Sequence, residues 1–387
     1  MSQQARCYVE ISRSRIAANY RAVRDAVRPG TGVICVVKAN AYGHGAVQVS
    51  RVLVAEGAEW LAVSSVEEGI ALRHGGILCR VLVMAGIMPW EREALRDYRL
   101  TPVVHSLEDF AALDLGAGGG CGAGCRCIEA MDVHLKVDTG MDRLGTLASA
   151  REIAETAAKH PGIRIEGLLS HFASPTDFHS SQTPDQIRAF GAMVRDLAEL
   201  GIRPPVLHFD STNAVAYPRA EAGLEPGMSL VRPGHAIYGY VSPTRGTAPA
   251  PTFRVEPALT WKARIVAVKD VQAGAKIGYG GSFVAPGPMR IGVIAAGYAD
   301  GVPHRLSNKG KVIAGGRYAP ILGTVSMDLT TIDVTQSAHL VPGDDVTLLG
   351  SEGDVSLDAQ QIAKAAGTIS YNVLCGISAR VKRFYVD

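Results

Sequence analysis

Short apolar runs alternate with amphipathic segments along the first 240 residues of this 387-residue chain. The run from Val33 to Val37 is rich in β-branched residues, a pattern typical of a strand buried on both faces. Seven further runs predict strands: Leu61–Ser64, Arg80–Met84, Thr101–His105, Met131–Val137, Ile165–His171, Val206–Phe209 and Ser229–Val231. Segments with helical periodicity lie between most of them, and the clearest are Arg13–Val27, Ala46–Ala55, Arg151–Lys159 and Pro184–Leu200.

This alternation predicts an α/β fold, either a (β/α)8 TIM barrel or a doubly wound sheet. Polar residues that could do chemistry follow several different strands. Lys38 comes after the first predicted strand, Arg143 after the fifth and Arg232 after the eighth. Only a closed barrel brings the first strand beside the eighth, so that these side chains meet at the carboxyl ends of the strands. We therefore expect the barrel.

The pattern changes near residue 241, where a stretch rich in Pro, Thr and Gly predicts a linker. Beyond it, strand patterns separated by turns dominate. The expected strands are Leu259–Val268, Arg290–Ala295, Pro320–Thr324, Thr331–Val334 and Asp345–Leu349, with one helix at Leu357–Ala366. We expect a barrel at 13–240, a linker at 241–254 and a C-terminal mainly-β domain at 255–387. The N-terminal segment 1–12, with a strand at Arg6–Ile11, is a candidate to pair with that domain.

Composition and charge exclude several classes of function. The 39 Lys and Arg residues and 37 Asp and Glu residues leave a net charge of +2, so no nucleic-acid or membrane-surface partner is indicated. No apolar run is long enough to span a bilayer, and the polar segment Met1–Arg15 carries no apolar signal segment, which predicts a cytoplasmic protein. The seven cysteines lack zinc-like spacing, so no metal is expected. Three of them, Cys121, Cys125 and Cys127, lie in a glycine-rich loop that we interpret as an insertion with reduced thiols.

Lys38 stands where the first predicted strand leaves the core. Burying an unpaired ammonium group is costly, and a lowered pKa is the usual result. A partly desolvated, neutral lysine is a nucleophile that forms Schiff bases with carbonyl compounds. A lone lysine at this place would more often reach to water, so the residues around it decide the interpretation.

The segment Lys38-Ala39-Asn40-Ala41-Tyr42-Gly43-His44-Gly45 resembles the pyridoxal-phosphate lysine motif of alanine racemases. Further segments that resemble the family follow in family order: His134–Gly145, Ser170–Ala173, Val231–Gly234, Ala296–Gly301, Ser326–Asp328 and Gly367–Tyr371. The resemblance spans nearly the whole chain. It implies the barrel and β domain expected above, the cofactor pyridoxal 5'-phosphate, and the interconversion of L- and D-alanine.

The resemblance also implies roles for individual residues. Lys38 would hold the cofactor as a Schiff base and then act as the base on one face of the substrate, and Tyr298 would be the base on the other face. Arg232 would meet the pyridine nitrogen, and its fixed charge would disfavour protonation there, which favours racemisation over transamination. The other implied residues are Tyr42, Thr212, Gly234, His235 and Tyr371 at the phosphate, Ser211 and His171 at the cofactor, Arg143 and Met327 at the substrate carboxylate, and Lys136 and Asp328 in support. In some family members the lysine at the position of Lys136 is carbamylated.

In this family the tyrosine and methionine that correspond to Tyr298 and Met327 act in the partner subunit's site. The resemblance therefore implies a head-to-tail homodimer that acts on a small amino acid.

Four positions depart from the commonest pattern of the family. Ser211-Thr212 stands where Asn-Ser is usual, His235 replaces an aliphatic residue, Leu329 replaces glutamine and Asn372 replaces glutamate. Thr212 keeps a hydroxyl for the phosphate, but the substrate stays open, with serine or a broader set of small amino acids as the alternative.

Two more distant alternatives are a fold-related decarboxylase of basic amino acids and a non-catalytic pyridoxal-phosphate carrier. Such decarboxylases usually pair the pyridine nitrogen with a carboxylate, which Arg232 disfavours. Carriers can consist of a barrel alone, which the segment 255–387 disfavours.

Overall fold

The computed structural model describes residues 5–114, 130–219 and 229–387, and within them the chain divides into two compact units. The barrel unit consists of residues 16–41 and 46–256. The β unit consists of the residues up to Arg15, the segment 42–45, and residues 257–387. The short segment 42–45 thus belongs to the β unit, although the chain on both sides of it belongs to the barrel unit.

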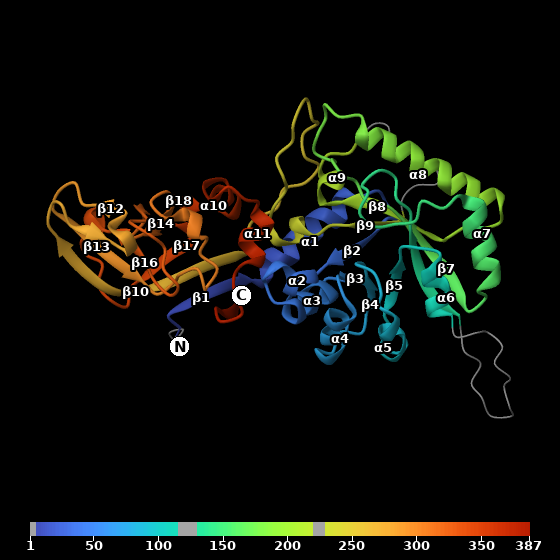
Figure 1. The fold of residues 1–387 in the computed structure, drawn as a ribbon, viewed down its shortest axis with the longest axis horizontal. Coiled ribbons are helices and arrows are strands. Elements are labelled where there is room, and N and C mark those ends of the chain that lie inside the picture. Colours follow the sequence, from blue (N-terminus) through green and yellow to red (C-terminus); the bar gives the residue numbers. More distant parts are fainter. Residues whose placement is uncertain (1–4, 115–129, 220–228) are drawn as a thin grey trace. The chain divides into compact units, whose positions relative to one another are not determined.

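The barrel unit contains a closed barrel of parallel strands in the order β2 to β9, which confirms the predicted fold (Figure 1). The strands are β2 (Gly32–Val36), β3 (Trp60–Val63), β4 (Arg80–Val83), β5 (Thr101–Val104), β6 (Met131–Lys136), β7 (Ile163–Leu169), β8 (Val206–Ser211) and β9 (Leu230–Arg232). Strand β2 pairs with β9, with Gly32 opposite Leu230, and this pairing closes the barrel. Each predicted strand is present with shifted ends. Strand β7 ends at Leu169 rather than at the predicted His171, so His171 lies in the segment that follows the strand.

The helices of the barrel unit are α1 (Arg13–Ala26), α3 (Ala46–Ala55), α4 (Val66–His74), α5 (Arg92–Asp97), α6 (Glu108–Leu113), α7 (Ala150–Lys159), α8 (Gln182–Glu199) and α9 (Thr212–Ala216). Helix α1 is shared between the two units, because its residues up to Arg15 belong to the β unit and the rest belong to the barrel unit. The amphipathic face predicted for α8 is confirmed by its buried residues Ile187, Phe190 and Leu197. At the start of α7, the Ser149 hydroxyl accepts a hydrogen bond from the backbone N–H of Glu152 in a capping box.

The β unit contains a nine-stranded sheet that follows the order β15-β14-β17-β10-β1-β19, with β13, β16 and β18 joined at its side. Its strands are β1 (Cys7–Ser12), β10 (Leu259–Val271), β13 (Met289–Ile294), β14 (Lys311–Ala314), β15 (Arg317–Pro320), β16 (Thr330–Asp333), β17 (Asp345–Glu352), β18 (Val355–Leu357) and β19 (Lys382–Val386). A separate pair is formed by β11 (Lys276–Ile277) and β12 (Phe283–Val284), and the helices are α10 (Ala359–Ala366) and α11 (Ser370–Cys375). The N-terminal strand β1 runs antiparallel to β10 and parallel to β19.

One predicted strand of this unit is wrong. The segment Pro320–Thr324 is not a strand, because β15 ends at Pro320 and only Ile321 continues, in a single bridge to Ile332. The chain then turns at Gly323, whose φ of +73° is a left-handed conformation and whose N–H donates to Asn308 Oδ1 over 2.6 Å.

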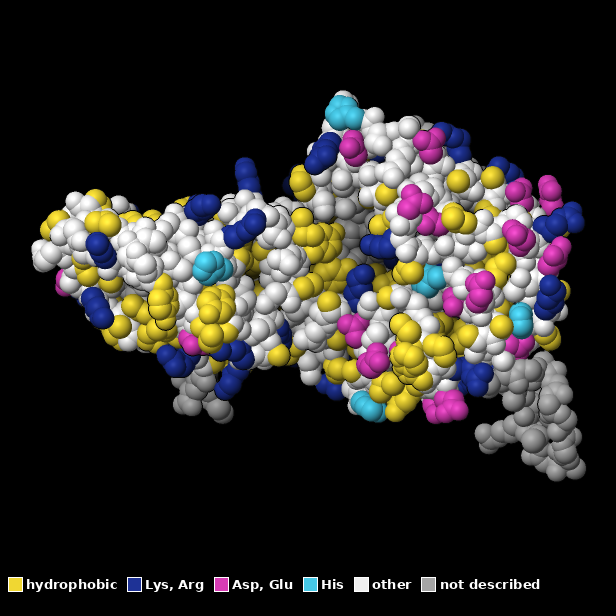
Figure 2. Space-filling model, viewed as in Figure 1, with side chains coloured by type: hydrophobic (Ala, Val, Ile, Leu, Met, Phe, Trp, Pro, Cys, Tyr) yellow, Lys and Arg dark blue, Asp and Glu magenta, His cyan; other side chains and the backbone are white. Residues whose placement is uncertain are grey.

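None of the helices in the described ranges combines the length and the apolarity needed to cross a membrane. On the visible face of the barrel unit, basic and acidic side chains are interspersed rather than gathered by sign (Figure 2). The loop with Cys121, Cys125 and Cys127 lies outside the described residues, and the four cysteines within them, Cys7, Cys35, Cys79 and Cys375, are free thiols.

Candidate active site

Lys38 directly precedes a left-handed turn of four residues. In the segment labelled α2 (Lys38–Tyr42), Ala39, Asn40, Ala41 and Tyr42 have φ values between +51° and +54°. A left-handed conformation costs a residue with a Cβ roughly 1–2 kcal/mol, so a run of four must be held by its surroundings.

Two side chains hold this turn. From α4, the Glu68 carboxylate accepts hydrogen bonds from the N–H of Ala39 over 2.6 Å and from the N–H of Ser64 over 2.7 Å. Within the turn, Asn40 Oδ1 accepts from the N–H of Ala46 over 2.8 Å, at the start of α3. These contacts fix the backbone from which the Lys38 side chain projects.

Four cations act on one imidazole at the carboxyl ends of the strands. Burial, together with the charges of Arg232, Lys136, Arg143 and Lys38, lowers the pKa of His171 to about 3. The field of four positive charges at a single ring indicates a site built for an anion.

Lys136, the last residue of β6, is a buried member of this group. Burial lowers its pKa to about 8, and the charges of Arg143 and Arg232 act in the same direction. Within the described residues Arg143 forms no ion pair with Asp138 or Asp142. The Asp138 carboxylate instead accepts from the backbone N–H groups of Gly140 and Met141, over 2.9 and 3.0 Å.

Arg232 lies at the end of β9 and is 4% exposed. Its two terminal nitrogens donate to His208 Nδ1 over 2.7 Å and to the backbone oxygens of His208, Ser170 and Phe209 over 2.7, 2.6 and 3.1 Å. Burial lowers its pKa to about 10, so the guanidinium stays charged at neutral pH. These bonds leave Nε as the donor that could meet a ring nitrogen.

A chain of hydrogen bonds continues from Arg232 through the inside of the barrel. Because arginine only donates, His208 accepts at Nδ1 and its Nε2–H donates to His134 Nδ1 over 2.8 Å. His134 Nε2 then lies 3.4 Å from the Glu166 carboxylate. Arg80 donates two hydrogen bonds to the same carboxylate, over 2.6 and 2.5 Å. Burial lowers the pKa of both histidines, so both stay neutral and their tautomers are set by this chain.

Backbone N–H groups converge on one hydroxyl between β8 and β9. Ser211 ends β8 and Thr212 begins α9, and Thr212 Oγ1 accepts from the N–H of Gly234 over 3.0 Å and of Ala236 over 3.2 Å. His235 starts the short 3₁₀ helix His235–Tyr238, and its ring stacks on Tyr240 with centroids 5.0 Å apart. Convergent N–H and O–H groups of this kind are suited to a phosphate.

In the β unit, Tyr42 and Tyr371 lie against each other with ring centroids 5.9 Å apart. Burial raises the pKa of Tyr42, and the neighbouring Tyr371 adds to this effect, so the Tyr42 hydroxyl remains a donor at any ordinary pH. Segment 42–45 is closely packed: a Cβ on Gly43 would come within 2.4 Å of the Leu374 backbone oxygen.

Tyr298 and Met327 lie on two neighbouring turns of the β unit. The N–H of Tyr298 donates to Ser326 O and the N–H of Ala299 to Met327 O, each over 3.0 Å. Both side chains are unusually exposed for their type, Tyr298 at 46% and Met327 at 53%. These two residues, both implied by the family resemblance, thus lie on adjoining turns of the β unit with their side chains exposed.

Comparisons with known proteins agree with this arrangement. Residues 11–243 match the family model described as alanine racemase, N-terminal domain, and residues 258–385 match alanine racemase, C-terminal domain. An alanine racemase of Halothermothrix orenii is 36% identical over 379 residues, covering 98% of this chain and 96% of the relative. One of Syntrophobacter fumaroxidans is 37% identical over 385 residues, covering 98% of each. The chain belongs to the alanine racemase family.

Solved alanine racemase structures extend the likeness to the fold. That of the enzyme from E. faecalis has a TM-score of 0.87 at 28% identity, and all of both chains is covered. That from Bartonella henselae, described with covalently bound pyridoxal phosphate, has a TM-score of 0.82 at 28% identity and covers 99% of this chain and all of that one.

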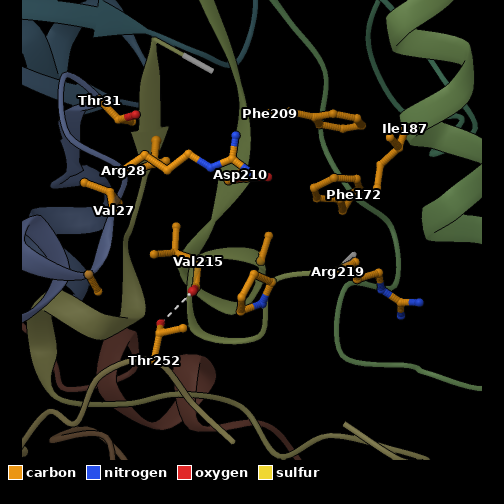
Figure 3. A pocket seen from close by; sticks show the side chains of 14 residues that line it. Val27, Arg28, Thr31, Phe172, Ile187, Phe209, Asp210, Val215, Arg219 and Thr252 are labelled. Atoms are coloured by element: carbon orange, nitrogen blue, oxygen red, sulfur yellow. Dashed lines mark hydrogen bonds between the residues drawn. The ribbon is translucent and has the colours of Figure 1, made fainter. Parts of the chain in front are cut away.

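A cavity of about 150 Å³ lies outside the family's expected site (Figure 3). Phe172, Ile187, Phe209 and Val215 form its apolar wall, and the Arg28 side chain extends toward Asp210. Burial raises the pKa of Asp210 to about 6. No sequence-predicted site residue lines this cavity, so it is not the cofactor site.

Sequence reasoning missed several residues that support the site. Glu68 holds the turn that follows Lys38, His208 contacts Arg232, and Glu166 contacts His134, the partner of His208. None of the three belongs to a motif of its own. Strand alternation could have found two histidines: His134 lies two residues before Lys136 on β6, so both face the same side, and His208 occupies an inward position on β8. Glu68 gave no such signal, because it acts from a helix on the backbone of a distant turn.

Proposed function

We propose that this protein interconverts L- and D-alanine by a two-base reaction with pyridoxal 5'-phosphate. The observation that carries the proposal is the group of four cations at the carboxyl ends of the barrel strands, one of which, Lys38, is presented by a strained turn. Family membership supports the same reaction class, an amino-acid isomerisation.

The residues present fit the cofactor. Thr212, Gly234, Tyr42 and Tyr371 would hold the phosphate, because they carry the hydroxyl and N–H donors that a phosphate dianion requires. His235 would contribute backbone rather than side chain, since its ring stacks on Tyr240. Ser211 and His171 would border the cofactor ring. When bound, the cofactor supplies an electron sink for the charge left at the substrate Cα when its proton is removed.

Lys38 Nζ and Tyr298 Oη are proposed as the two proton-carrying atoms, one for each face of Cα. Lys38 would hold the cofactor through its amine, and the same amine would hold or release the proton on one face of the substrate. Tyr298 does the same on the other face, and its exposure on a surface turn leaves it accessible for that task. The backbone N–H of Met327 and the guanidinium of Arg143 orient the substrate carboxylate.

Arg232 is proposed to donate from Nε to the pyridine nitrogen. Because it stays charged and is held by five hydrogen bonds, one of them to His171 Nδ1 over 3.4 Å, protonation of that nitrogen is disfavoured. The electron sink is then weak, and prompt reprotonation at Cα is favoured over transamination. A decarboxylase of this fold usually places a carboxylate at this position, so Arg232 favours the racemase.

The exposed face of the β unit supports a head-to-tail homodimer. Tyr279, Tyr298 and Met327 are 76%, 46% and 53% exposed, which is unusual for large apolar or aromatic side chains and favours an interface. We propose that Tyr298 and Met327, with Asp328 in support, complete the partner subunit's site. Free thiols within the described residues suit a reducing compartment, which supports a cytoplasmic location. We keep residues 13–240, 241–254 and 255–387 as the proposed domain boundaries, with the N-terminal strand added to the last.

The experiment that tests this function uses purified dimer loaded with pyridoxal phosphate. Lys38→Ala should remove the visible absorbance of the bound cofactor and the racemisation of alanine together. Tyr298→Phe should keep the absorbance and lower kcat by about 10²-fold or more, the usual contribution of a positioned acid or base. Lys159→Ala, on the exposed end of α7, is the matched control and should change neither. Cofactor binding without racemisation of alanine, serine or similar amino acids would contradict the proposal.

A screen across all L-amino acids tests the alternatives. Racemisation confined to alanine supports the narrow substrate range, and comparable rates for serine support the broader one. Release of carbon dioxide from ornithine, lysine or arginine would instead support the decarboxylase.

A further inference from the structure

Arg380 connects the two turns that carry Tyr298 and Met327. Its Nε donates to Asp300 Oδ1 over 2.7 Å, and its Nη2 donates to Asp300 Oδ2 over 3.3 Å and to Asp328 Oδ1 over 2.7 Å. Asp300 lies two residues after Tyr298, and Asp328 directly follows Met327. One guanidinium therefore bonds to both turns at once.

The Asp300 end of this contact is buried and fixes the backbone of the tyrosine turn. Asp300 is 3% exposed, and its Oδ2 also accepts from the N–H of Gly297 over 2.9 Å. Gly297 has no room for a side chain, because a Cβ would come within 2.3 Å of the backbone oxygens of Met327 and Ser326. The turn at Tyr298 thus rests directly on the turn at Met327, and Asp300 closes it from within.

The ion pair between Arg380 and Asp328 is exposed, and it connects Arg380 to the turn that contains Met327. The Asp328 side chain is 57% exposed and that of Arg380 is 49% exposed. Within that turn the N–H of Ser326 donates to Leu329 O over 3.0 Å, so the turn is closed on itself, and Arg380 is the side chain that joins it to Asp300. A lysine could not do the same, because a single ammonium lacks the planar fork that reaches two carboxylates.

We propose that Arg380 is a positioning residue that sets Tyr298 and Met327 in one fixed relation, so that the proton-carrying hydroxyl and the carboxylate-binding N–H reach a substrate together. This inference rests on the function proposed above for those two residues. Without the guanidinium, the buried Asp300 carboxylate retains the N–H of Gly297 as its one partner among the described residues, and it would turn toward water and loosen the Tyr298 turn. Asp300 shares the role of Arg380, and neither touches the substrate.

Arg380→Ala tests the inference when it is combined with Tyr298→Phe. In the presence of Tyr298 it should lower kcat by about 10- to 100-fold, since a misplacement of about 1 Å has effects of that size. In the Tyr298→Phe background the same substitution should lower kcat by less than about 3-fold, because its partner in the reaction is already lost. A role in stability alone would give the same fold-loss in both backgrounds. Added guanidinium ion should restore part of the kcat of Arg380→Ala, since the site is half exposed, and should not do so in the double variant.

Two further variants keep the test decisive if Arg380→Ala folds poorly. Asp328→Asn, at an exposed position, should raise KM for alanine by about 3- to 10-fold with little change in kcat, because it loosens only the Met327 turn. Arg290→Ala removes a surface ion pair with Asp270 in the same unit and is the matched control, with no change expected in either constant.

Equal losses of kcat in both backgrounds, or no loss, would overturn the role of Arg380 alone. Full activity of Tyr298→Phe by itself would overturn the proposed base, and this inference with it.

Discussion

At the scale of single residues, charge explains most of what the candidate site could do. The positive charges of four residues act on His171, and one of the two that are buried, Lys136, has its pKa lowered to about 8. A lysine with such a pKa has a sizeable neutral fraction at pH 8, and only the neutral amine reacts with carbon dioxide. A carbamate on Lys136 would place a negative charge beside Arg143 and Arg232, whose charges now oppose its ammonium.

We therefore expect Lys136 to be carbamylated when bicarbonate is present at pH 8 to 9. Intact mass measurement after chemical trapping should find one added carboxyl group per chain, and Lys136→Ala should remove it. Lys159→Ala should retain the modification. A trapped protein of unmodified mass at high bicarbonate would contradict this expectation.

A second residue-scale prediction concerns pH and stability. Burial alone would raise the pKa of Glu166, but hydrogen bonds from His134 and Arg80, together with the charge of Arg80, lower it from its ordinary value of 4.5 to about 2. A carboxylate with a lowered folded-state pKa stabilises the fold above its unfolded pKa, and this stabilisation is lost as the pH falls toward 2.

Glu166→Gln should therefore lower the free energy of unfolding at pH 7 by about 1–3 kcal/mol, the usual effect of leaving buried polar groups without a charged partner. The difference from the unchanged protein should shrink as the pH falls from 5 to 3. Thermal unfolding across this range measures it, with Glu199→Gln, at an exposed helix end, as the control. A difference that stays constant or grows in acid would show that the carboxylate charge is not responsible.

At the scale of elements, the left-handed turn after Lys38 is the most demanding local structure. It contains four residues with a Cβ in a conformation that such residues avoid, and Glu68 and Asn40 hold it through backbone N–H groups. The strain is thus balanced by contacts with α4 and α3. The left-handed conformation of this segment therefore could not be predicted from the local conformational preferences of its residues.

Ala39→Val should be costly for this reason. A β-branched side chain at a φ of +52° clashes with its own backbone, and we expect a loss of about 2 kcal/mol in the free energy of unfolding. The same change at Ala158, an exposed position on the right-handed helix α7, should cost about 0.5 kcal/mol. Urea unfolding of both variants provides the comparison. Equal losses at the two positions would mean that the turn is not strained in solution.

The helices and strands also show how much of the fold could be predicted from the sequence. The barrel strands were predictable, because each is a short apolar run, and Lys38 and Arg232 were predictable as residues that follow two of these runs. Strand β19 escaped notice since its sequence, Lys382–Val386, is half polar and its position depends on pairing with β1, over 370 residues away. Likewise, Pro320–Thr324 has the composition of a strand, but Gly323 and Asn308 turn the chain there.

Contacts between distant residues limited the prediction of the site in the same way. Glu68 reaches the turn after Lys38 from a helix, and Arg380 reaches Asp300 from 80 residues along the chain. Neither belongs to a local pattern, so only the folded chain brings them to their partners.

At the scale of the whole molecule, the proposed dimer makes a prediction that a monomeric enzyme cannot satisfy. If Lys38 and Tyr298 of one site come from different chains, a mixed dimer of Lys38→Ala and Tyr298→Phe chains has one site with both defects and one intact site. Random exchange of the two inactive variants should then restore about a quarter of the sites. Recovery of alanine racemisation after mixing and subunit exchange measures this, and each variant exchanged with itself is the control. No recovery from a mixture shown to contain mixed dimers would contradict the shared site.

The division of the chain between its two units also bears on how this protein could be taken apart or recombined. The backbone passes from one unit to the other at residues 15–16, 41–42, 45–46 and 256–257. A single nick after residue 256 would therefore release residues 257–387 as a separate fragment, while the first strand and segment 42–45 of the same unit would stay covalently attached to the barrel unit. A chimera spliced at residue 256 would give the β unit a first strand and a four-residue insert from one parent and the remainder from the other. Exchange of this unit between relatives thus requires three grafts, and the smallest of them, 42–45, follows the proposed catalytic lysine by four residues.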